Sequence, residues 1–366
     1  MNAFIDIAAP GISELKPYTP GKPISELERE LGISQSIKLA SNENPLGTSP
    51  KVSEAIQSAI PELARYPDGG GFELRQALAE KHRIDPACIT LGNGSNDVLD
   101  MVARVFLAPG GESLFSQYAF AVYPISSQAV GANLVIAPAK EFAHDLQAMR
   151  ERVTAKTRVV WIANPNNPTG TWVGKEALYT FINDLPAQVI VVLDEAYTEY
   201  VDQNDYPDGS QWLSEFPNLI VTRTFSKAYG LASLRMGYAL SHPDIADLLN
   251  RVRQPFNVNT LAQVGALAAL QDPSFIERSV EVNRVGMAQL MAGMEKLGLN
   301  YIPSVGNFLT VDFARNAGPI DQTLLQLGCI TRPLANYAMP NHLRFTIGLE
   351  AENTRLLESL QKVLVE

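Results

Sequence analysis

The sequence predicts an α/β protein in which helices cover both faces of a mostly parallel sheet, with a second, smaller α/β domain at the C-terminal end. Short continuous apolar runs recur along the first two thirds of the chain, and segments with helical spacing of apolar residues separate them. Polar loops follow these runs, as is typical of the ligand-binding edge of a parallel sheet. After Pro255 the pattern changes to a long helix and two further strand-like segments. The apolar runs are 88–91, 134–136, 159–162, 189–193 and 219–221.

The composition is that of an ordinary globular protein. The 366 residues are 46% apolar and 19% charged, enough to bury the core of two domains or one large one. A net charge of −10 and a pI near 5.0 argue against nucleic acid or an anionic membrane as the main partner, because both require a basic face. No apolar run reaches the roughly 18 residues of a membrane span. Because Cys88 and Cys329 lack metal-ligand spacing and fit a reducing compartment, we expect a cytoplasmic protein without a metal.

The chain begins with a proline-rich arm. The prolines between residues 10 and 23 surround Tyr18, which forbids a regular helix and favours an extended segment over a surface. A short helix is predicted from residue 25, and residues 39–47 form a polar, turn-rich loop that faces either a ligand or solvent. We predict three parts, which are an N-terminal arm over 1–35, a large domain over 36–255 and a small domain over 256–366.

The strand 88–91 leads into a glycine-rich turn, residues 92–96, at the start of a helix. Free backbone N–H groups and the partial positive charge at a helix start favour a phosphate. A dinucleotide fingerprint would need a third glycine at position 97, where Asp97 stands, so the sequence does not support a nicotinamide site. A purely structural turn is the alternative interpretation.

Two later runs also end in polar segments. Residues 159–162 precede the loop 164–170, in which two prolines and three asparagines form a rigid turn. Asp194 ends the most apolar run of the chain, 189–193. A carboxylate at the end of a buried strand is costly unless a cation or hydrogen-bond donors compensate, so Asp194 is a more informative candidate than Glu195. A helix cap is the alternative role for Asp194.

Lys227 follows the apolar run 219–221. A lysine at the end of a buried strand loses its proton through desolvation and neighbouring charge, and the neutral amine forms Schiff bases with aldehydes. A lysine that extends from a loop into solvent is the structural alternative. Together, Lys227, Asp194, the helix start at 94–96 and the aromatic Tyr118 supply the amine, counterion, anion cradle and ring contact that pyridoxal phosphate needs.

The C-terminal third carries two arginines on neighbouring segments. Strand-like residues 308–311 and 342–346 follow a long helix, and a final helix has its leucines on one stripe. Arg332 and Arg344 are twelve residues apart (344 − 332 = 12), close enough to converge on one anion, since guanidinium groups bind carboxylate or phosphate through paired hydrogen bonds. A surface ion pair is the commoner role of either arginine alone.

These motifs together resemble those of the fold-type I aminotransferases, and among them the histidinol-phosphate aminotransferase family. The resemblance extends roughly over residues 18–350. It implies a large domain with a mostly parallel seven-stranded sheet flanked by helices, pyridoxal 5'-phosphate as the cofactor, and a homodimer with shared active sites. The matching motifs are 39–47, 164–170, 193–197, 224–227 with Arg235, and 332–348.

The resemblance implies a role for each candidate residue. Lys227 would form the Schiff base with the cofactor, and Asp194 would pair with its pyridine nitrogen. Tyr197 and Asn167 would bind its phenolic oxygen. One departure is the turn 94–96, where many members of the family carry an acidic residue. The other implied cofactor contacts are Tyr118 on the ring, Gly94, Ser95, Asn96, Thr224, Ser226 and Arg235 on the phosphate, and Tyr66 on the phosphate of the neighbouring subunit.

The resemblance also implies a substrate site and a reaction. Arg332 and Arg344 would bind the substrate's anion, Tyr18 would close over it, and Asn42 and Asn167 would contact the substrate. The implied reaction converts histidinol phosphate and 2-oxoglutarate into imidazole acetol phosphate and glutamate, in histidine biosynthesis.

Three alternative functions stay open. An aromatic amino-acid aminotransferase would use the same residues, because apolar pockets discriminate weakly between rings. A threonine-phosphate decarboxylase is also similar. A non-catalytic ligand sensor would be expected to lack Lys227 or Asp194, and both are present.

Overall fold

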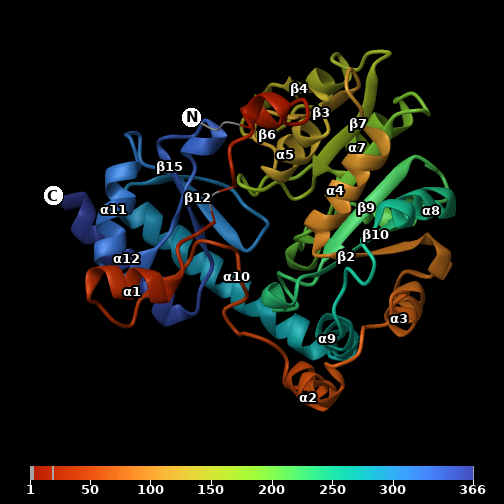
Figure 1. Ribbon diagram of the computed structural model, residues 1–366. Helices are drawn as coiled ribbons and strands as arrows, with labels where there is room; N and C mark the ends of the chain where they lie inside the picture. The colour runs from red at the N-terminus through yellow and green to blue at the C-terminus, as the bar shows by residue number, and fades with distance from the viewer. Residues whose placement is uncertain (1–3, 19, 366) are drawn as a thin grey trace.

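A twisted seven-stranded sheet forms the centre of the larger part of the molecule (Figure 1). The computed structural model describes residues 4–18 and 20–365. The strand order is β2-β10-β9-β8-β7-β3-β4, and all neighbours are parallel except β10, which runs antiparallel to β2 and β9. The predicted mostly parallel, seven-stranded sheet is therefore confirmed. Its strands are β2 (Ile89–Asn93), β3 (Glu112–Ser116), β4 (Asn133–Ala137), β7 (Thr157–Ala163), β8 (Ile190–Asp194), β9 (Leu219–Thr224) and β10 (Met236–Ser241).

Helices cover both faces of this sheet, which explains why its strands are continuous apolar runs. Side chains alternate between two faces along a strand, so on β8 Val191 and Leu193 enter one hydrophobic cluster while Ile190 and Val192 enter the other. One face is covered by α4 (Ser95–Phe106), α5 (Val122–Ala129) and α8 (Pro243–Val252). The other is covered by α2 (Pro50–Ala59), α3 (Phe72–His82), α6 (Leu146–Arg150), α7 (Lys175–Asn183) and α9 (Thr260–Leu270).

The C-terminal part contains an antiparallel four-stranded sheet of order β11-β12-β15-β14. Alternation along β15 sends Leu343 and Phe345 into the core of this part, while Arg344 faces the cavity described below. The strands are β11 (Asn300–Ile302), β12 (Phe308–Asp312), β14 (Arg332–Pro333) and β15 (His342–Thr346), and the helices are α10 (Pro273–Lys296), α11 (Gly318–Gln326) and α12 (Glu350–Val365).

The N-terminal segment joins the C-terminal part. Strand β1 (Ile37–Lys38) pairs in parallel with β13 (Cys329–Ile330), and helix α1 (Ile24–Leu31) buries Leu27 in a cluster with Ala40 and Ile330. Helix α9, in contrast, packs on α2 and in the core of the large sheet. The first contact joins residues on both sides of the predicted boundary at 35/36 to the C-terminal part. The second joins a helix that follows the predicted boundary at 255/256 to the large sheet. The division into three parts stays a prediction.

The arm before α1 runs from the large sheet to the C-terminal part. A β-carbon at Gly11 would lie 2.0 Å from the carbonyl oxygen of Gln128 at the end of α5, so the arm is closely packed there. Between residues 15 and 23 the described residues form no helix or strand, as the prolines predict. The short elements outside the two main sheets are the 3-10 helices η1 (Ile5–Ile7), η2 (Ile12–Glu14), η3 (Ile60–Glu62), η4 (Pro86–Cys88), η5 (Thr198–Tyr200), η6 (Gly209–Trp212), η7 (Ala232–Leu234) and η8 (Ala335–Tyr337), and the hairpin strands β5 (Ala139–Lys140) and β6 (Ala143–His144).

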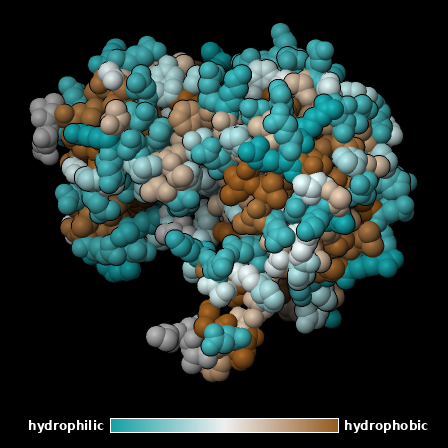
Figure 2. All heavy atoms as spheres, turned by 90° about the horizontal axis from the view of Figure 1, so that it is seen from above, coloured by the Kyte–Doolittle hydropathy of each residue, from teal (hydrophilic) through white to brown (hydrophobic). Residues whose placement is uncertain are grey.

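The surface is mixed, with apolar patches among hydrophilic side chains on the face shown in Figure 2. Large apolar side chains stay exposed on the arm, on the segment between α2 and α3, where Tyr66 is 80% exposed, and at the start of α3, where Phe72 is 65% exposed. Within residues 4–18 and 20–365, no helix combines the length and the hydropathy that crossing a membrane would need.

Candidate active site

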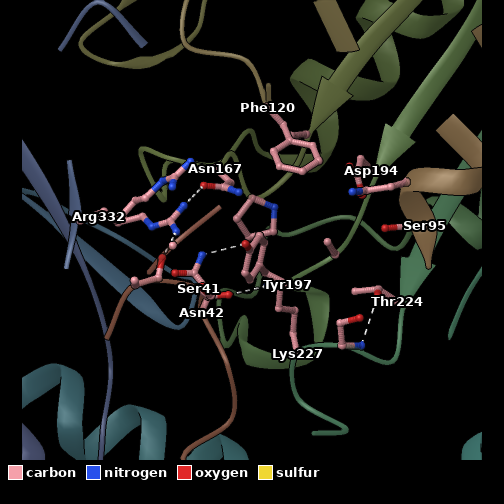
Figure 3. Close-up of a pocket in the computed structure, with 18 of the residues that line it drawn as sticks. Ser41, Asn42, Ser95, Phe120, Asn167, Asp194, Tyr197, Thr224, Lys227 and Arg332 are labelled. Carbon is pink, nitrogen blue, oxygen red and sulfur yellow. Dashed lines mark hydrogen bonds between the residues drawn. The ribbon is translucent and has the colours of Figure 1, made fainter. Parts of the chain in front are cut away.

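A cavity lies where the carboxyl ends of β7, β8 and β9 meet the arm and the strands β14 and β15. Figure 3 shows side chains from these distant segments pointing into one space. Most of the predicted site residues line it, namely Tyr18, Asn42, Ser95, Asn96, Asn167, Asp194, Tyr197, Thr224, Ser226, Lys227, Arg235, Arg332 and Arg344. The lining also includes residues that the sequence did not single out, which are Gly21, Ala40, Ser41, Phe120, Ala163, Pro165, Ala196 and Tyr337.

Lys227 lies in the turn that follows β9, at the bottom of the view in Figure 3. Its Nζ donates to the carbonyl oxygen of Ser41 at 3.0 Å and lies 5.7 Å from the centre of the Tyr197 ring. Burial lowers the pKa of the Lys227 amine to about 7, and the charge of Arg344 acts in the same direction while Glu43 opposes it. A large share of this amine is therefore neutral, and nucleophilic, near neutral pH.

Asp194 ends β8 and is 4% exposed. Its carboxylate accepts hydrogen bonds from the hydroxyls of Tyr123, at 2.8 Å, and Thr222, at 3.0 Å. Burial raises the pKa of Asp194, and these two donors act against that rise. Within residues 4–18 and 20–365 it forms no salt bridge, although it lines the cavity. This carboxylate is thus held by neutral groups and is available to a cationic group of a ligand.

The start of α4 also lines the cavity, and none of the side chains that the structure describes caps its backbone N–H groups. Gly94 has a φ of 81°, which favours glycine. A β-carbon at Gly94 would lie 2.4 Å from Nη2 of Arg235, and one at Gly237 would lie 2.2 Å from the Ser95 nitrogen. The hydroxyls and amides of Ser95, Asn96, Thr224 and Ser226 complete the lining here. A helix N-terminus with an arginine and several hydroxyls is suited to a phosphate.

Tyr197 occupies the middle of the view, between Lys227 and the side chains of Asn42 and Asn167 (Figure 3). Its phenolic oxygen accepts a hydrogen bond from Nδ2 of Asn42 at 2.9 Å. Burial raises the pKa of Tyr197 to about 12, with Arg344 and Asn42 acting in the opposite direction. The phenol is therefore protonated at neutral pH. Asn167 accepts a hydrogen bond from the guanidinium of Arg344.

Arg332 and Arg344 stand directly opposite each other on β14 and β15, which confirms that they converge. Both are less than 10% exposed. The guanidinium carbon of Arg332 lies 5.3 Å from the centre of the Tyr18 ring, and Arg344 donates to the carbonyl oxygen of Ala40 at 2.7 Å. In the described part of the chain, Nε of Arg344 is buried without a partner. Two facing cations repel, so an anion between them would relieve an unfavourable pair.

Three predicted residues do not line this subunit's cavity. Tyr118 is outside the cavity lining, and its ring lies 5.5 Å from Phe142, so Phe120 is the aromatic residue of this loop that lines the cavity. Both belong to one loop after β3, whose orientation a short sequence pattern does not specify. Gly94 contributes space for Arg235 rather than a lining side chain. Tyr66 stacks on Phe256 with ring centres 4.6 Å apart, away from this subunit's cavity.

The neighbouring carboxylate, Glu195, binds on the opposite side of the chain. It accepts from Nε and Nη2 of Arg223 at 2.9 and 2.6 Å and from the Gly209 nitrogen at 2.7 Å. Arg223 also donates to Asp208 at 2.6 Å. Burial raises the pKa of Glu195, and Arg223 acts against that rise. Glu195 does not line the cavity.

Comparison with known proteins agrees with this architecture. The signature of the family described as aminotransferase class I and II matches residues 34–360, nearly the whole chain, so the chain belongs to that family. It is 59% identical over 363 residues to histidinol-phosphate aminotransferase 2 of Pseudomonas fluorescens Pf0-1, with 99% of this chain and 98% of that protein covered. It is 58% identical over 366 residues to histidinol-phosphate aminotransferase 2 of Pseudomonas aeruginosa PAO1, with 100% and 99% covered.

A solved structure has the same fold. The histidinol-phosphate aminotransferase of Sinorhizobium meliloti, determined in complex with pyridoxal-5'-phosphate, matches with a TM-score of 0.90 and 29% identity over 97% of each chain. The resemblance that the motifs indicated is thereby confirmed, including the fold-type I architecture. The roles of the individual site residues stay predictions.

Proposed function

We propose that this chain is a pyridoxal-phosphate-dependent aminotransferase that exchanges the amino group between histidinol phosphate and 2-oxoglutarate. The observation that carries the proposal is the shared cavity of a lysine with a pKa near 7, a carboxylate without a cationic partner among the described residues, and a bare helix start beside an arginine. The family and the relatives named above support the substrate. When bound, pyridoxal phosphate supplies an aldehyde that a lysine amine captures and a ring that accepts electrons from the substrate carbon.

The residues present fit this cofactor. Gly94 and Gly237 leave room at the start of α4 that a β-carbon would fill, and the donors around it suit a phosphate dianion. Asp194 would hold the ring nitrogen in its protonated form, since a buried carboxylate is stabilised by a cationic neighbour. Phe120, rather than Tyr118, would lie on the ring. Tyr197 and Asn167 would bind the phenolic oxygen. The phosphate would be held by Ser95, Asn96, Thr224, Ser226 and Arg235.

The chain's own residues then perform two tasks. The Lys227 amine would remove a proton from the substrate carbon that bears the amino group and would deliver it to the C4′ carbon of the cofactor, because a pKa near 7 suits both roles at neutral pH. Arg332 and Arg344 orient the substrate through its anionic end, and Tyr18 covers them. Two half reactions that share one site imply ping-pong kinetics.

The charge of the cavity supports two anions. A chain with a net charge of −10 lines this cavity with four basic side chains and one carboxylate, which are Lys227, Arg235, Arg332, Arg344 and Asp194. One anion would be the cofactor's phosphate beside Arg235. The other would be the phosphate of histidinol phosphate or the carboxylate of 2-oxoglutarate beside the paired arginines, which offer hydrogen bonds to either group.

We also infer a homodimer in a reducing compartment, the cytoplasm. The stacked pair of Tyr66 and Phe256 is exposed on this subunit, 80% and 45% respectively. An exposed aromatic group of this kind supports a subunit interface, from which Tyr66 would reach the neighbouring cavity. The two cysteines are free, which fits a reducing compartment.

The test uses purified enzyme loaded with pyridoxal phosphate. It is mixed separately with histidinol phosphate, phenylalanine and threonine phosphate, and the rate of the absorbance change that accompanies amino transfer is measured. We expect histidinol phosphate to react fastest, and Lys227→Ala to lose the lysine-dependent absorbance band and nearly all turnover. A much faster reaction with phenylalanine would favour an aromatic aminotransferase. Carbon dioxide released from threonine phosphate without an acceptor would indicate the decarboxylase.

A further inference from the structure

Asn42 is enclosed by protein on all of its polar groups. It is 1% exposed and has a φ of 54°, in the left-handed region that few residues other than glycine adopt. Its Nδ2 donates to the Tyr197 oxygen at 2.9 Å, and its backbone nitrogen donates to Oγ1 of Thr346 at 2.9 Å. Its Oδ1 accepts from Oγ1 of Thr346 at 3.3 Å, and its carbonyl oxygen accepts from Nδ2 of Asn307 at 3.0 Å. The amide oxygen and one amide hydrogen of this side chain are therefore already used in bonds within the protein.

The bond between Asn42 and Tyr197 has a defined polarity. The Thr346 hydroxyl accepts from the Asn42 backbone and donates to Oδ1, which turns the amide nitrogen toward Tyr197. An amide nitrogen only donates, so the phenolic oxygen is the acceptor in this bond. The single phenolic hydrogen of Tyr197 is then free for another acceptor, and Tyr197 lines the cavity.

We propose that Asn42 is a positioning residue that directs the phenolic hydrogen of Tyr197 into the cavity and ties Tyr197 to the C-terminal sheet through Thr346 and Asn307. The inference rests on the proposed function, in which the phenolic oxygen of the cofactor accepts that hydrogen. A raised pKa for Tyr197 agrees with this direction, because the phenol keeps its proton.

The network spans segments that are far apart in sequence. Asn42 lies in the loop after β1, Thr346 ends β15, and Tyr197 follows β8. Arg344, the proposed anion-binding residue, stands two positions before Thr346 on the same strand face. A single asparagine thus connects the strand that would hold the substrate's anion with the phenol that would contact the cofactor.

The test measures the pH midpoint of the absorbance change of the bound cofactor in the holoenzyme. A hydrogen bond from Tyr197 to the phenolic oxygen of the cofactor would reduce the attraction of that oxygen for the proton on the nitrogen that joins Lys227 to the cofactor. When Asn42 no longer directs the Tyr197 hydrogen, this bond weakens and the midpoint rises. We expect Asn42→Leu, which has a similar size and no charge, to raise it by roughly 0.5–1 pH unit, the effect of one hydrogen bond. Asn42→Asp, with the same shape but an accepting carboxylate, should raise it further.

The decisive comparison repeats both substitutions in a Tyr197→Phe background. There the shift of Asn42→Leu should vanish, because the residue acts only through the Tyr197 hydroxyl. A shift that persists in this background, or none with Tyr197 present, would overturn the inference. Asn353→Asp is the matched control, since Asn353 is also fully buried and its Nδ2 donates to Gln289 and Gly348, away from the cavity. It should fold less stably and leave the midpoint unchanged.

The outcome also separates this inference from the proposed function. If the unaltered enzyme binds no pyridoxal phosphate or its absorbance does not titrate, the proposed function fails. If it titrates normally and both Asn42 variants match it while folding as measured by urea denaturation, only the role of Asn42 fails. Should Asn42→Leu fold poorly, the isosteric Asn42→Asp decides alone through its dependence on Tyr197.

Discussion

Asp194 and Glu195 are adjacent carboxylates at the end of one buried strand, yet they have opposite surroundings. Asp194 accepts from two hydroxyls and faces the cavity, whereas Glu195 accepts from the Arg223 guanidinium and the Gly209 amide on the other side. Burial raises the pKa of both. The difference shows that burial alone does not identify a site residue. What distinguishes Asp194 is that the side chains that donate hydrogen bonds to it are neutral, which leaves its charge available to a ligand.

Removing Arg223 from its ion pair with Glu195 should have the largest effect, which we expect to be a loss of stability. Arg223→Met leaves Glu195 buried without its counterion, and we expect a loss of about 3–5 kcal/mol in the free energy of unfolding. Urea denaturation of the cofactor-free protein measures it. The double variant Glu195→Gln with Arg223→Met, which keeps an acceptor for the Gly209 nitrogen, should recover much of that loss. Equal stability of Arg223→Met and the unaltered protein would contradict the structural role of the pair.

For Asp194→Asn we expect the reverse, a large loss of turnover and a small loss of stability. Turnover of the loaded enzyme should fall on the order of 10²- to 10³-fold, because in the proposed function the charge of Asp194 stabilises the protonated ring nitrogen of the cofactor. The amide still offers one acceptor to Tyr123 or Thr222, so unfolding of the cofactor-free protein should change by only about 1 kcal/mol. Steady-state kinetics measures the loss of turnover, and urea denaturation measures the change in stability. A variant that loses stability but keeps its turnover would reverse the assignment of the two carboxylates.

Lys227 should give the most graded effect, because its protonation changes continuously with pH. Its neutral amine is the reactive form, so the rate at which cofactor-free enzyme captures pyridoxal phosphate should rise about tenfold per unit below pH 7 and level off above it. The stability of the folded protein should also rise with pH. From pH 7 to 10.5 the unfolded chain holds a proton that the folded chain lacks, so stability relative to a Lys227→Met variant should rise with pH across this range. A capture rate that keeps rising to pH 10 would mean an ordinary lysine.

The sequence predicted the parts of the site that follow strands. Asp194 directly follows an apolar run and Lys227 lies in the turn after the next one, and parallel strands bring such positions to one edge, so their meeting follows from periodicity and topology. That Phe120 rather than Tyr118 lines the cavity could not be predicted, because it depends on the conformation of the loop after β3. The bonds from Tyr123 to Asp194 and from Asn42 to Tyr197 join residues 71 and 155 positions apart, which a local pattern does not reveal.

Gly94, the N-cap of α4, and Gly237, which lies against the start of α4 on β10, have a consequence for how this chain tolerates mutation. Gly94 and Gly237 have no functional group, but any side chain there would collide with Arg235 or with the Ser95 backbone. A survey that scored every substitution by lost activity would therefore rank these two positions beside Lys227. Their contribution is the empty volume that the Arg235 guanidinium and the Ser95 backbone need in order to lie this close.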